Sequence, residues 1–299
     1  GFTGREEQVI GVDLGTTFSV VAVQSGDGVR VIPNYQSNKK TTPSCVTFHP
    51  NGTTIVGEEC TQFRQTNPLS SIYNAKRFIG MPFSAVEANP DLLDYPFNVE
   101  DVTEMVKNLP KKKGVERLKS HAWFRVPTTG VNTKLVSPEE VGSEILKVLR
   151  DSVVKAFDWD VTKAVACVPA DFSGVQRLAT KKAFELAGLT VVRMMEEPTC
   201  AAVAYNLDLI PEPRHIMVYD IGGGTLDCSM LFMNGDGGQT TNRKGQSKVR
   251  GSITVLGSEG DPHFGGSDFD EAMLALVKKQ WQGKLEGSDQ GSCADQYLR

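Results

Sequence analysis

Residues 216–229 read IMVYDIGGGTLDCS, where an apolar run ends at Asp220, three glycines follow and a second acid stands at Asp227. Three consecutive glycines weaken a strand, but they allow a tight turn whose bare N–H groups can close on an anion. Two carboxylates beside an anion would repel it unless a cation lay between them. The stretch therefore predicts a phosphate group that is held through a divalent metal ion.

A second copy of this pattern stands near the start of the chain. Residues 9–17 read VIGVDLGTT, again an apolar strand, an acid at Asp13, a hydrophobic residue and a Gly/Thr-rich turn. The repeat predicts two similar lobes that each offer one hairpin to a ligand in the cleft between them. The sequence contains no GxxxxGK[ST] motif, and each glycine turn leads into a strand rather than a helix, so neither a P-loop nor a Rossmann fingerprint is present.

The composition bounds the class of protein. The chain has 299 residues, of which 39% are hydrophobic and 23% charged, as in a globular protein with one large or two ordinary domains. A net charge of −4 gives no reason to expect a nucleic-acid partner, which would need a basic face. No apolar run has the length of a membrane span. We expect neither a nucleic acid nor a membrane as a partner.

The cysteines form no CxxC pair and lie far apart, so we expect buried thiols rather than disulfides or metal ligands. They are Cys45, Cys60, Cys167, Cys200, Cys228 and Cys293. Residues 51–53 read NGT, which is a glycosylation sequon and also an ordinary Asn-Gly turn between two strands. The sequon matters only if the protein enters the secretory pathway.

The order of elements indicates an α/β fold. We expect strands over 8–13, 18–24, 29–33, 43–48, 53–56, 164–168, 190–195, 216–220 and 253–256. We expect helices over 137–149, 173–187, 198–206 and 266–280, with helical structure also within 58–80. The segment 230–251 is almost devoid of apolar residues after its first few positions, which predicts a flexible loop.

The paired hairpins resemble those of the superfamily of actin, sugar kinases and seventy-kilodalton heat-shock (Hsp70) chaperones, whose two-lobed ATPase fold has ribonuclease-H-like lobes. Five further stretches resemble the Hsp70 branch in particular. They are TPS at 42–44, NAKRFIG at 74–80, VPA at 168–170, EPTCAA at 197–202 and GGSDFD at 265–270. Within that branch, Ile72-Tyr73, residues 77–80 and Asp171 resemble the microsomal stress-seventy-like ATPase.

The resemblance implies a division of the chain. Residues 1–7 would precede the domain, 8–207 would form lobe I, and 208–299 would form part of lobe II with a flexible loop at 233–251. Family members continue into more of lobe II, where a further glycine motif and basic residues hold the adenosine, and then into a peptide-binding domain. We therefore expect a truncated second lobe and weak nucleotide binding by this chain.

The resemblance also implies ATP or ADP with Mg²⁺ as ligands. Asp13 and Asp220 would hold Mg²⁺ largely through its waters, and Lys76 would orient the attacking water. Glu197 and Asp227, with Thr225, would complete the shell of water and metal. The phosphate-binding positions would be Gly15, Thr16, Thr17, Gly222, Gly223, Gly224, Thr225, Gly265 and Gly266.

Partners follow from the resemblance in the same way. Pro169 and Arg177 match residues that link the nucleotide state to the substrate domain, and Arg193 matches a contact for J-domain co-chaperones. A nucleotide-exchange factor would be a further partner, and unfolded clients would bind only through a domain that this chain lacks. The chain departs from the family at 173–175, which reads SGV for the usual Asn-Asp-Ser, and at Glu196 and Phe18, which stand for Asn and Tyr.

These features predict an ATP-hydrolysing nucleotide-binding domain of an Hsp70-type chaperone, in which hydrolysis drives a conformational switch in protein folding and the stress response. A regulatory pseudo-ATPase that only binds nucleotide is one alternative, and a sugar kinase of the same fold is another. The expected compartment is the cytoplasm, or the lumen of the endoplasmic reticulum if a leader has been removed.

Overall fold

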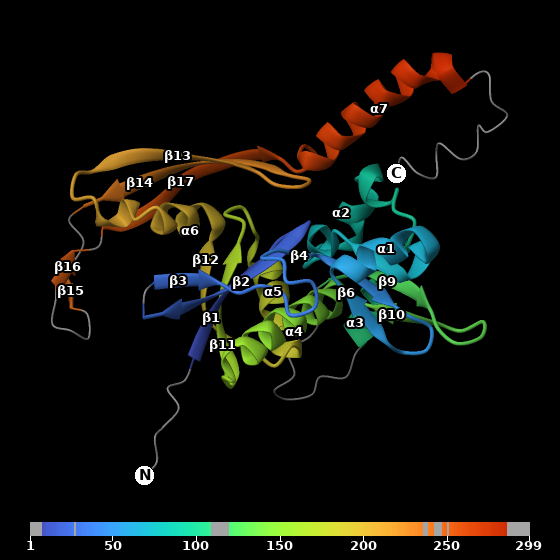
Figure 1. Cartoon of the computed structure of the whole chain (residues 1–299), viewed down its shortest axis with the longest axis horizontal. Helices are drawn as coiled ribbons and strands as arrows, with labels where there is room; N and C mark the ends of the chain where they lie inside the picture. Colours follow the sequence, from blue (N-terminus) through green and yellow to red (C-terminus); the bar gives the residue numbers. More distant parts are fainter. Residues whose placement is uncertain are drawn as a thin grey trace, which may run out of the picture.

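The computed structural model describes residues 8–26, 28–108, 120–235, 239–241, 247–249 and 251–285. Its largest sheet has the strand order β12-β11-β1-β2-β3, and β4 pairs with β2 (Figure 1). The pairs β1–β2 and β2–β3 are antiparallel, whereas β1–β11 and β11–β12 are parallel. The strands are β1 (Gln8–Leu14), β2 (Phe18–Ser25), β3 (Gly28–Val31), β4 (Thr42–Pro43), β11 (Val161–Val168) and β12 (Thr190–Glu196). The predicted α/β class and the meander at the start of the chain are confirmed.

The central strand β1 is amphipathic along its length. Ile10, Val12 and Leu14 are buried, while the intervening residues, Asp13 among them, point to the opposite face. This alternation buries one face of the strand in the core. It leaves Asp13 on the other face, near the end of the strand where the first turn begins.

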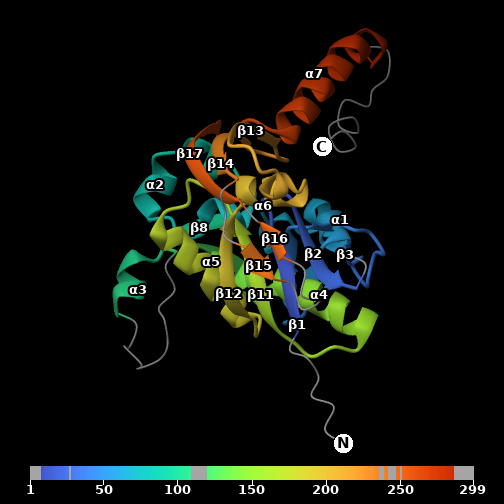
Figure 2. The ribbon, with the colours of Figure 1, turned by 90° about the vertical axis from the view of Figure 1, so that its left-hand side faces the viewer.

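Two helices with strong capping signals pack beside this sheet. Helix α4 (Pro138–Phe157) begins at a capping box of Ser137 with Glu140, and α5 (Gly174–Leu186) begins at a second box of Ser173 with Gln176. Helix α5 ends before Gly188, whose φ of +78° favours glycine. A third helix, α6 (Glu197–Ala204), contacts β11 and β12 on one side and the second sheet on the other (Figures 1 and 2).

The second sheet has the order β13-β14-β17 and is antiparallel, and α7 projects away from its end (Figure 1). These elements are β13 (Arg214–Ile221), β14 (Leu226–Asn234), β17 (Ser252–Asp261) and α7 (Gly266–Leu285). The expected apolar face of α7 is not buried, because 62% of Met273 and 56% of Leu276 are exposed.

The described parts of the predicted flexible loop at 230–251 include strand residues that the prediction missed. The first part continues β14, where Leu231 and Met233 are buried on one face, and β15 (Gln239–Thr241) pairs with β16 (Ser247–Val249). Strand pairing supplies the backbone with partners that the polar composition did not reveal. Residues 236–238, 242–246 and 250 lie outside the described part of the chain, as do 1–7 and Cys293.

Two small sheets complete the lobe that carries β1. One has the order β6-β5-β7 and the other β10-β9-β8. Their strands are β5 (Cys45–Phe48), β6 (Thr54–Val56), β7 (Ser71–Tyr73), β8 (Asn98–Asp101), β9 (Ala122–Pro127) and β10 (Thr133–Val136). Short helices lie beside them at α1 (Glu58–Thr66), α2 (Phe83–Glu87) and α3 (Thr103–Asn108). The segment 58–80 is therefore only partly helical, because β7 completes a sheet with β5.

The expectation that all cysteines are thiols is wrong for one pair. Cys45 of β5 and Cys60 of α1 form a disulfide across 15 positions of sequence. The β5–β6 hairpin returns the chain so that α1 packs on β5, and this brings the two positions together. Cys167, Cys200 and Cys228 are free thiols. None of the helices in the described ranges combines the length and the apolar character that a membrane span requires.

Candidate functional site

The two predicted turns lie against each other. A Cβ added to Gly223 would overlap Thr17 Oγ1 and stand 2.6 Å from Thr17 Cβ. The first turn is itself tight, because a Cβ at Gly15 would overlap the carbonyl oxygen of Phe18. Glycine at 223 is therefore required for the close approach of the two hairpins, and glycine at 15 is required for the tight first turn.

The first turn is held from the side by Ser44, which follows β4. The Ser44 N–H donates to the Thr17 carbonyl at 2.8 Å, and Ser44 Oγ donates to the Gly15 carbonyl at 2.8 Å. Ser44 Oγ also lies 2.9 Å from Ser19 Oγ. The motif at 42–44 thus fixes the backbone of the turn.

The second turn is held by the start of α7. The N–H groups of Gly266 and Ser267 donate to the carbonyls of Gly222 and Gly223, at 3.0 and 2.8 Å. A Cβ at Gly265 would stand 2.5 Å from the Gly224 nitrogen, so this residue also backs the turn. Arg77, which sequence reasoning did not single out for the site, donates from its guanidinium to the Gly224 carbonyl.

Lys76 reaches the site from a 3-10 turn at Ala75–Phe78. Its Nζ donates to Glu197 Oε1 at 2.7 Å, and the two side chains are only 12% and 22% exposed. Burial disfavours the ammonium form, but the Glu197 and Asp13 carboxylates outweigh this and raise the pKa of Lys76. The lysine therefore stays protonated.

The pKa values of the three aspartates around Lys76 are also raised. Asp220 of β13 and Asp227 of β14 pair directly across the ladder, and Asp13 is exposed near the end of β1. Burial raises the pKa of all three aspartates, Lys76 lowers it, and Glu197 raises it again.

This site carries more acids than bases. Four carboxylates face a single ammonium, an excess of negative charge that favours a bound cation. Among the described residues, no three His, Cys, Asp or Glu side chains stand close enough to grip a metal ion together.

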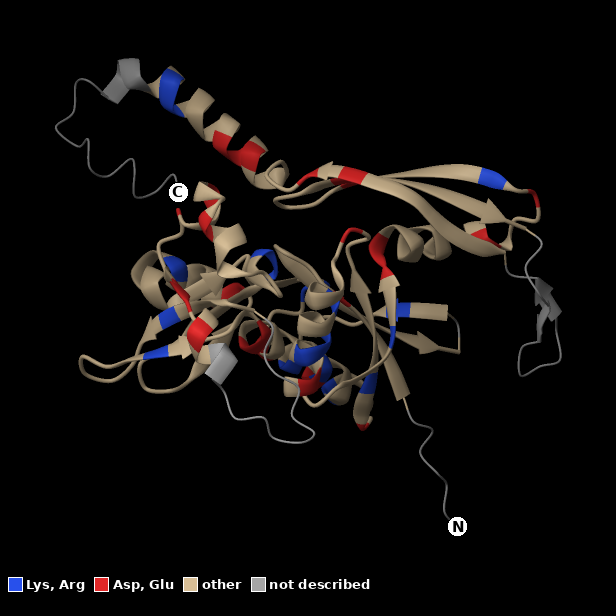
Figure 3. Cartoon of the chain, turned by 180° about the vertical axis from the view of Figure 1, so that it is seen from behind, with Lys and Arg blue, Asp and Glu red and all other residues tan. Residues whose placement is uncertain are grey.

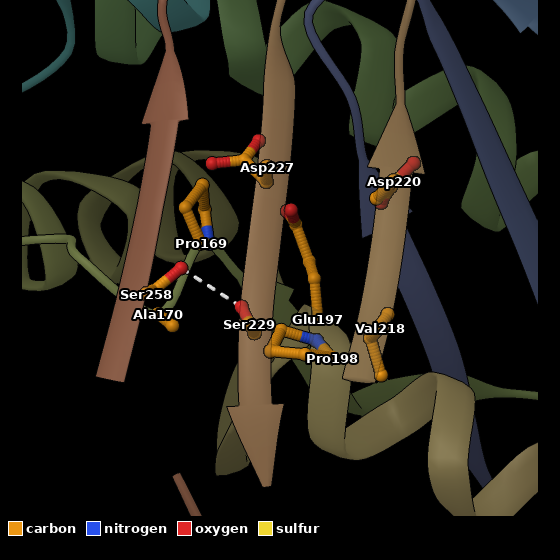
Figure 4. Close-up of a pocket in the computed structure, with 9 residues that line it drawn as sticks. All are labelled: Pro169, Ala170, Glu197, Pro198, Val218, Asp220, Asp227, Ser229 and Ser258. Carbon is orange, nitrogen blue, oxygen red and sulfur yellow. Dashed lines mark hydrogen bonds between the residues drawn. The ribbon is translucent and has the colours of Figure 1, made fainter. Parts of the chain in front are cut away.

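A small cavity lies between Glu197 and the strands that carry Asp220 and Asp227 (Figure 4). Its volume is about 10 Å³, which is close to the space that one ordered water needs. The lining residues are Pro169, Ala170, Glu197, Pro198, Val218, Asp220, Asp227, Ser229 and Ser258.

A larger pocket of about 440 Å³ begins at the first turn. This volume lies in the range of small-molecule sites. One wall holds Arg64 stacked on Tyr73, with the guanidinium 3.6 Å from the ring centre. The lining residues are Thr16, Thr17, Phe18, Lys39, Thr41, Pro43, Ser44, Cys45, Glu58, Thr61, Arg64, Tyr73 and Asn74.

Comparison of the sequence with protein families identifies the family of this chain. The model of the family described as "Hsp70 protein" matches residues 9–293. The chain belongs to the Hsp70 family. A similar curated protein is the chaperone protein dnaK of Cyanidioschyzon merolae, which is 36% identical over 282 residues, 94% of this chain. The chain spans 40% of the length of that relative. The finer resemblance to the microsomal branch stays a prediction.

Glu196, where the chain departs from the usual Hsp70 pattern, contacts Arg177, which matches it. Arg177 of α5 forms an ion pair with Glu196 at 3.1 Å and donates to the carbonyls of Phe172 and Ala170 at 3.0 and 3.2 Å. Arg193 is exposed on β12, the edge strand of the large sheet. In Figure 3, acidic and basic positions are interspersed over the ribbon rather than gathered in one basic face.

Proposed function

We propose that this Hsp70 chain binds ATP and ADP with Mg²⁺ and hydrolyses ATP, as the nucleotide-binding part of a chaperone whose conformation follows the nucleotide state. One observation carries the proposal, namely the contact between the Thr17 and Gly223 turns beside the Lys76–Glu197 pair. Phosphoryl transfer needs mainly positioning and charge neutralisation, and this site offers both.

The residues have distinct proposed roles. N–H groups of the two turns donate to phosphate oxygens, which rests on their close approach and on the backing of the second turn by Gly265 and Gly266. Asp13 and Asp220 would hold Mg²⁺ through its waters, and the ion supplies neutralisation of phosphate charge when bound. The Lys76 ammonium brings a second positive charge toward the terminal phosphate.

Hydrolysis also needs a placed water. We propose that the small cavity holds one between Glu197 and Asp227, with Thr225 near the same turn. Glu197 accepts a hydrogen bond from Lys76, so it orients the lysine and the water together. The 440 Å³ pocket beyond the first turn is large enough for a small molecule.

The intact Lys76–Glu197 pair supports hydrolysis over a pseudo-ATPase. A sugar kinase would need a further carboxylate base and sugar contacts, and no described residue of the site is assigned to either role. A single-turnover assay with saturating Mg²⁺–ATP and no acceptor tests the proposal. We expect inorganic phosphate to appear and chelation of the metal to stop it. In a parallel assay with glucose added, transfer of phosphate to the sugar would contradict the proposal.

The partners that we propose follow from family membership. A J-domain co-chaperone would bind near the exposed Arg193, a nucleotide-exchange factor would bind the same domain, and unfolded clients would bind elsewhere in the whole protein. Arg177 would still couple the nucleotide state to the neighbouring substrate domain. The acid that is missing at 173–175 has a counterpart in Glu196, which pairs with Arg177 at 3.1 Å.

Binding of Mg²⁺ and ADP is expected to release protons at acidic pH. Burial raises the pKa of Asp13 and Asp220 above the usual 3.8. At a given acidic pH, a larger fraction of each carboxyl is therefore protonated than in an unperturbed aspartate. A nearby cation favours the ionised form and expels these protons. Calorimetry in two buffers of different ionisation enthalpy measures the release. We expect it to shrink as the pH rises and to be smaller in Asp220→Asn, whereas equal release in that variant would contradict the assignment.

The raised pKa values also determine whether the stability of the fold rises or falls with pH. In the ligand-free chain, these carboxyls contribute stability that is fully present below the unfolded pKa and is lost as the pH rises through the raised folded values. Asp220→Asn therefore flattens that part of the pH dependence of the melting temperature.

Two features bear on the compartment. The cytoplasm stays the first proposal, but the Cys45–Cys60 disulfide is of a kind that persists in oxidising compartments such as the lumen of the endoplasmic reticulum. Asn51 is exposed in the β5–β6 hairpin, where its Oδ1 accepts from Thr53 N and Oγ1 at 2.9 and 2.7 Å.

We expect glycosylation at Asn51 when the chain is directed into the endoplasmic reticulum, because the sequon lies at an accessible turn. A glycosidase-sensitive shift in electrophoretic mobility measures it, and Asn51→Gln, which removes the sequon, should abolish that shift. A translocated chain without a glycan would show that the turn blocks modification. The presence or absence of the glycan on the natural protein then separates the two compartments.

A further inference from the structure

Two free thiols lie side by side behind the phosphate site. Cys167 near the end of β11 and Cys200 in α6 have their Sγ atoms 3.3 Å apart, with the Cys167 thiol donating. Both side chains are partly exposed, so a small reagent can reach them. Cys228, the other free thiol in the described part of the chain, lies on β14 in the second sheet.

The pair joins two elements that carry site residues. Cys167 stands opposite Asp13 in the β1–β11 register and two positions before Pro169, which lines the small cavity. Cys200 lies three positions after Glu197, on the same side of the first turns of α6. A movement of either sulfur can therefore displace a nearby acid of the site, Asp13 beside Cys167 or Glu197 beside Cys200.

We propose that Cys167 and Cys200 are a reversible oxidation site, and that closing their disulfide slows ATP hydrolysis. A disulfide has an S–S length of about 2.05 Å, so the sulfurs need approach by only roughly 1 Å. The alternative use of a thiol pair is a metal site, but no third ligand group completes one among the described residues. The effect on hydrolysis rests on the proposed function, whereas disulfide formation does not.

The reaction needs an oxidant, for which a low-molecular-weight disulfide such as glutathione disulfide is sufficient. The Cys200 sulfur attacks one glutathione sulfur, forms a mixed disulfide and releases the first glutathione thiol. The Cys167 sulfur then attacks Cys200 Sγ, the new disulfide forms and the second glutathione thiol leaves. Two thiol protons and two electrons pass to the oxidant, which is reduced to two glutathione molecules.

The hydrogen bond between the thiols supports this order of attack. Donation by Cys167 lowers the pKa of Cys200 and raises that of Cys167, and burial adds to the rise at Cys167. Cys200 is therefore the better first nucleophile, and Cys167 the resolving thiol.

Closure should disturb the site because it draws the end of β11 toward the first turns of α6. Glu197 holds Lys76 at 2.7 Å, and a displacement of about 1 Å at a catalytic group can reduce a rate by up to ~100-fold. We expect phosphate release to fall about tenfold on oxidation and to recover on reduction.

The test treats the purified chain with glutathione disulfide, blocks remaining thiols and maps the peptides by mass spectrometry. The unaltered chain should give peptides of Cys167 and Cys200 linked with the loss of two hydrogens, reversible by a thiol reductant. Cys167→Ala should stop at Cys200 with one glutathionyl group, because the resolving thiol is absent. Cys228→Ala is the matched control and should form the link normally.

Phosphate release is measured on the same samples. Oxidation should slow it in the unaltered chain and in Cys228→Ala but not in the double variant Cys167→Ala/Cys200→Ala. Failure of the link to form would overturn the proposed site, and a link without any change in rate would overturn its effect on hydrolysis. If the reduced chain releases no phosphate, the proposed function fails, and the peptide masses still decide on the oxidation site.

Discussion

Lys76→Met is expected to lower single-turnover ATP hydrolysis by about 100-fold or more, the usual loss when a charge-stabilising donor is removed from an active site. The ammonium lies among four carboxylates, and it donates to Glu197 at 2.7 Å. Without it, the acids repel one another and the terminal phosphate, and the water near Glu197 loses its orientation. Phosphate release with the metal and nucleotide saturating measures the effect.

Lys147→Met provides a matched control, because it also removes a lysine that pairs with a glutamate. Its partner is Glu144 at 2.6 Å on α4, in an ordinary i,i+3 pair whose lysine is 41% exposed. We expect this variant to hydrolyse ATP at the unaltered rate, since exposed pairs contribute little. Equal rates for Lys76→Met and Lys147→Met would contradict the role given to Lys76.

Gly223→Ala is expected to weaken the binding of Mg²⁺–ADP by about tenfold or more, which corresponds to ~1.4 kcal/mol. The added methyl group would overlap Thr17 Oγ1 and lie 2.6 Å from Thr17 Cβ, so the two turns would have to separate. Their N–H groups could then no longer close on the same phosphates. Isothermal calorimetry on the folded variant measures the loss.

Gly257→Ala is the control for this change. Gly257 lies in β17 of the same sheet, and a Cβ there would meet no atom within 4 Å. We expect its affinity for Mg²⁺–ADP to match that of the unaltered chain. An unchanged affinity in Gly223→Ala as well would show that the contact between the turns does not serve nucleotide binding.

The features that sequence predicts well are those set by local chemistry. The capping residues Ser137 and Ser173 stand where the sequence places helix starts, and Gly188 ends α5. The duplicated Asp-x-Gly pattern predicts two turns, and Gly223 and Thr17 are indeed in contact. These signals each depend on a few neighbouring residues, so they can be recognised without a fold.

The features that sequence could not supply depend on distant segments. The Cys45–Cys60 disulfide requires α1 to pack on β5, and the Cys167–Cys200 contact requires α6 to lie beside β11. Arg77 stands beside the predicted Lys76, yet its donation to Gly224 spans 147 positions. An aspartate–glycine pattern predicts a turn, but only tertiary packing determines which side chain binds to that turn.

The most direct test of the central claim is a crystal structure of the chain with Mg²⁺ and a non-hydrolysable ATP analogue. We predict that the β- and γ-phosphates lie between the turn at Gly15 and Thr17 and the turn at Gly222–Gly224, with Lys76 Nζ beside the γ-phosphate. The metal ion should meet Asp13 and Asp220 through its waters. Phosphates bound away from either turn, or bound by one turn alone, would contradict the two-sided site.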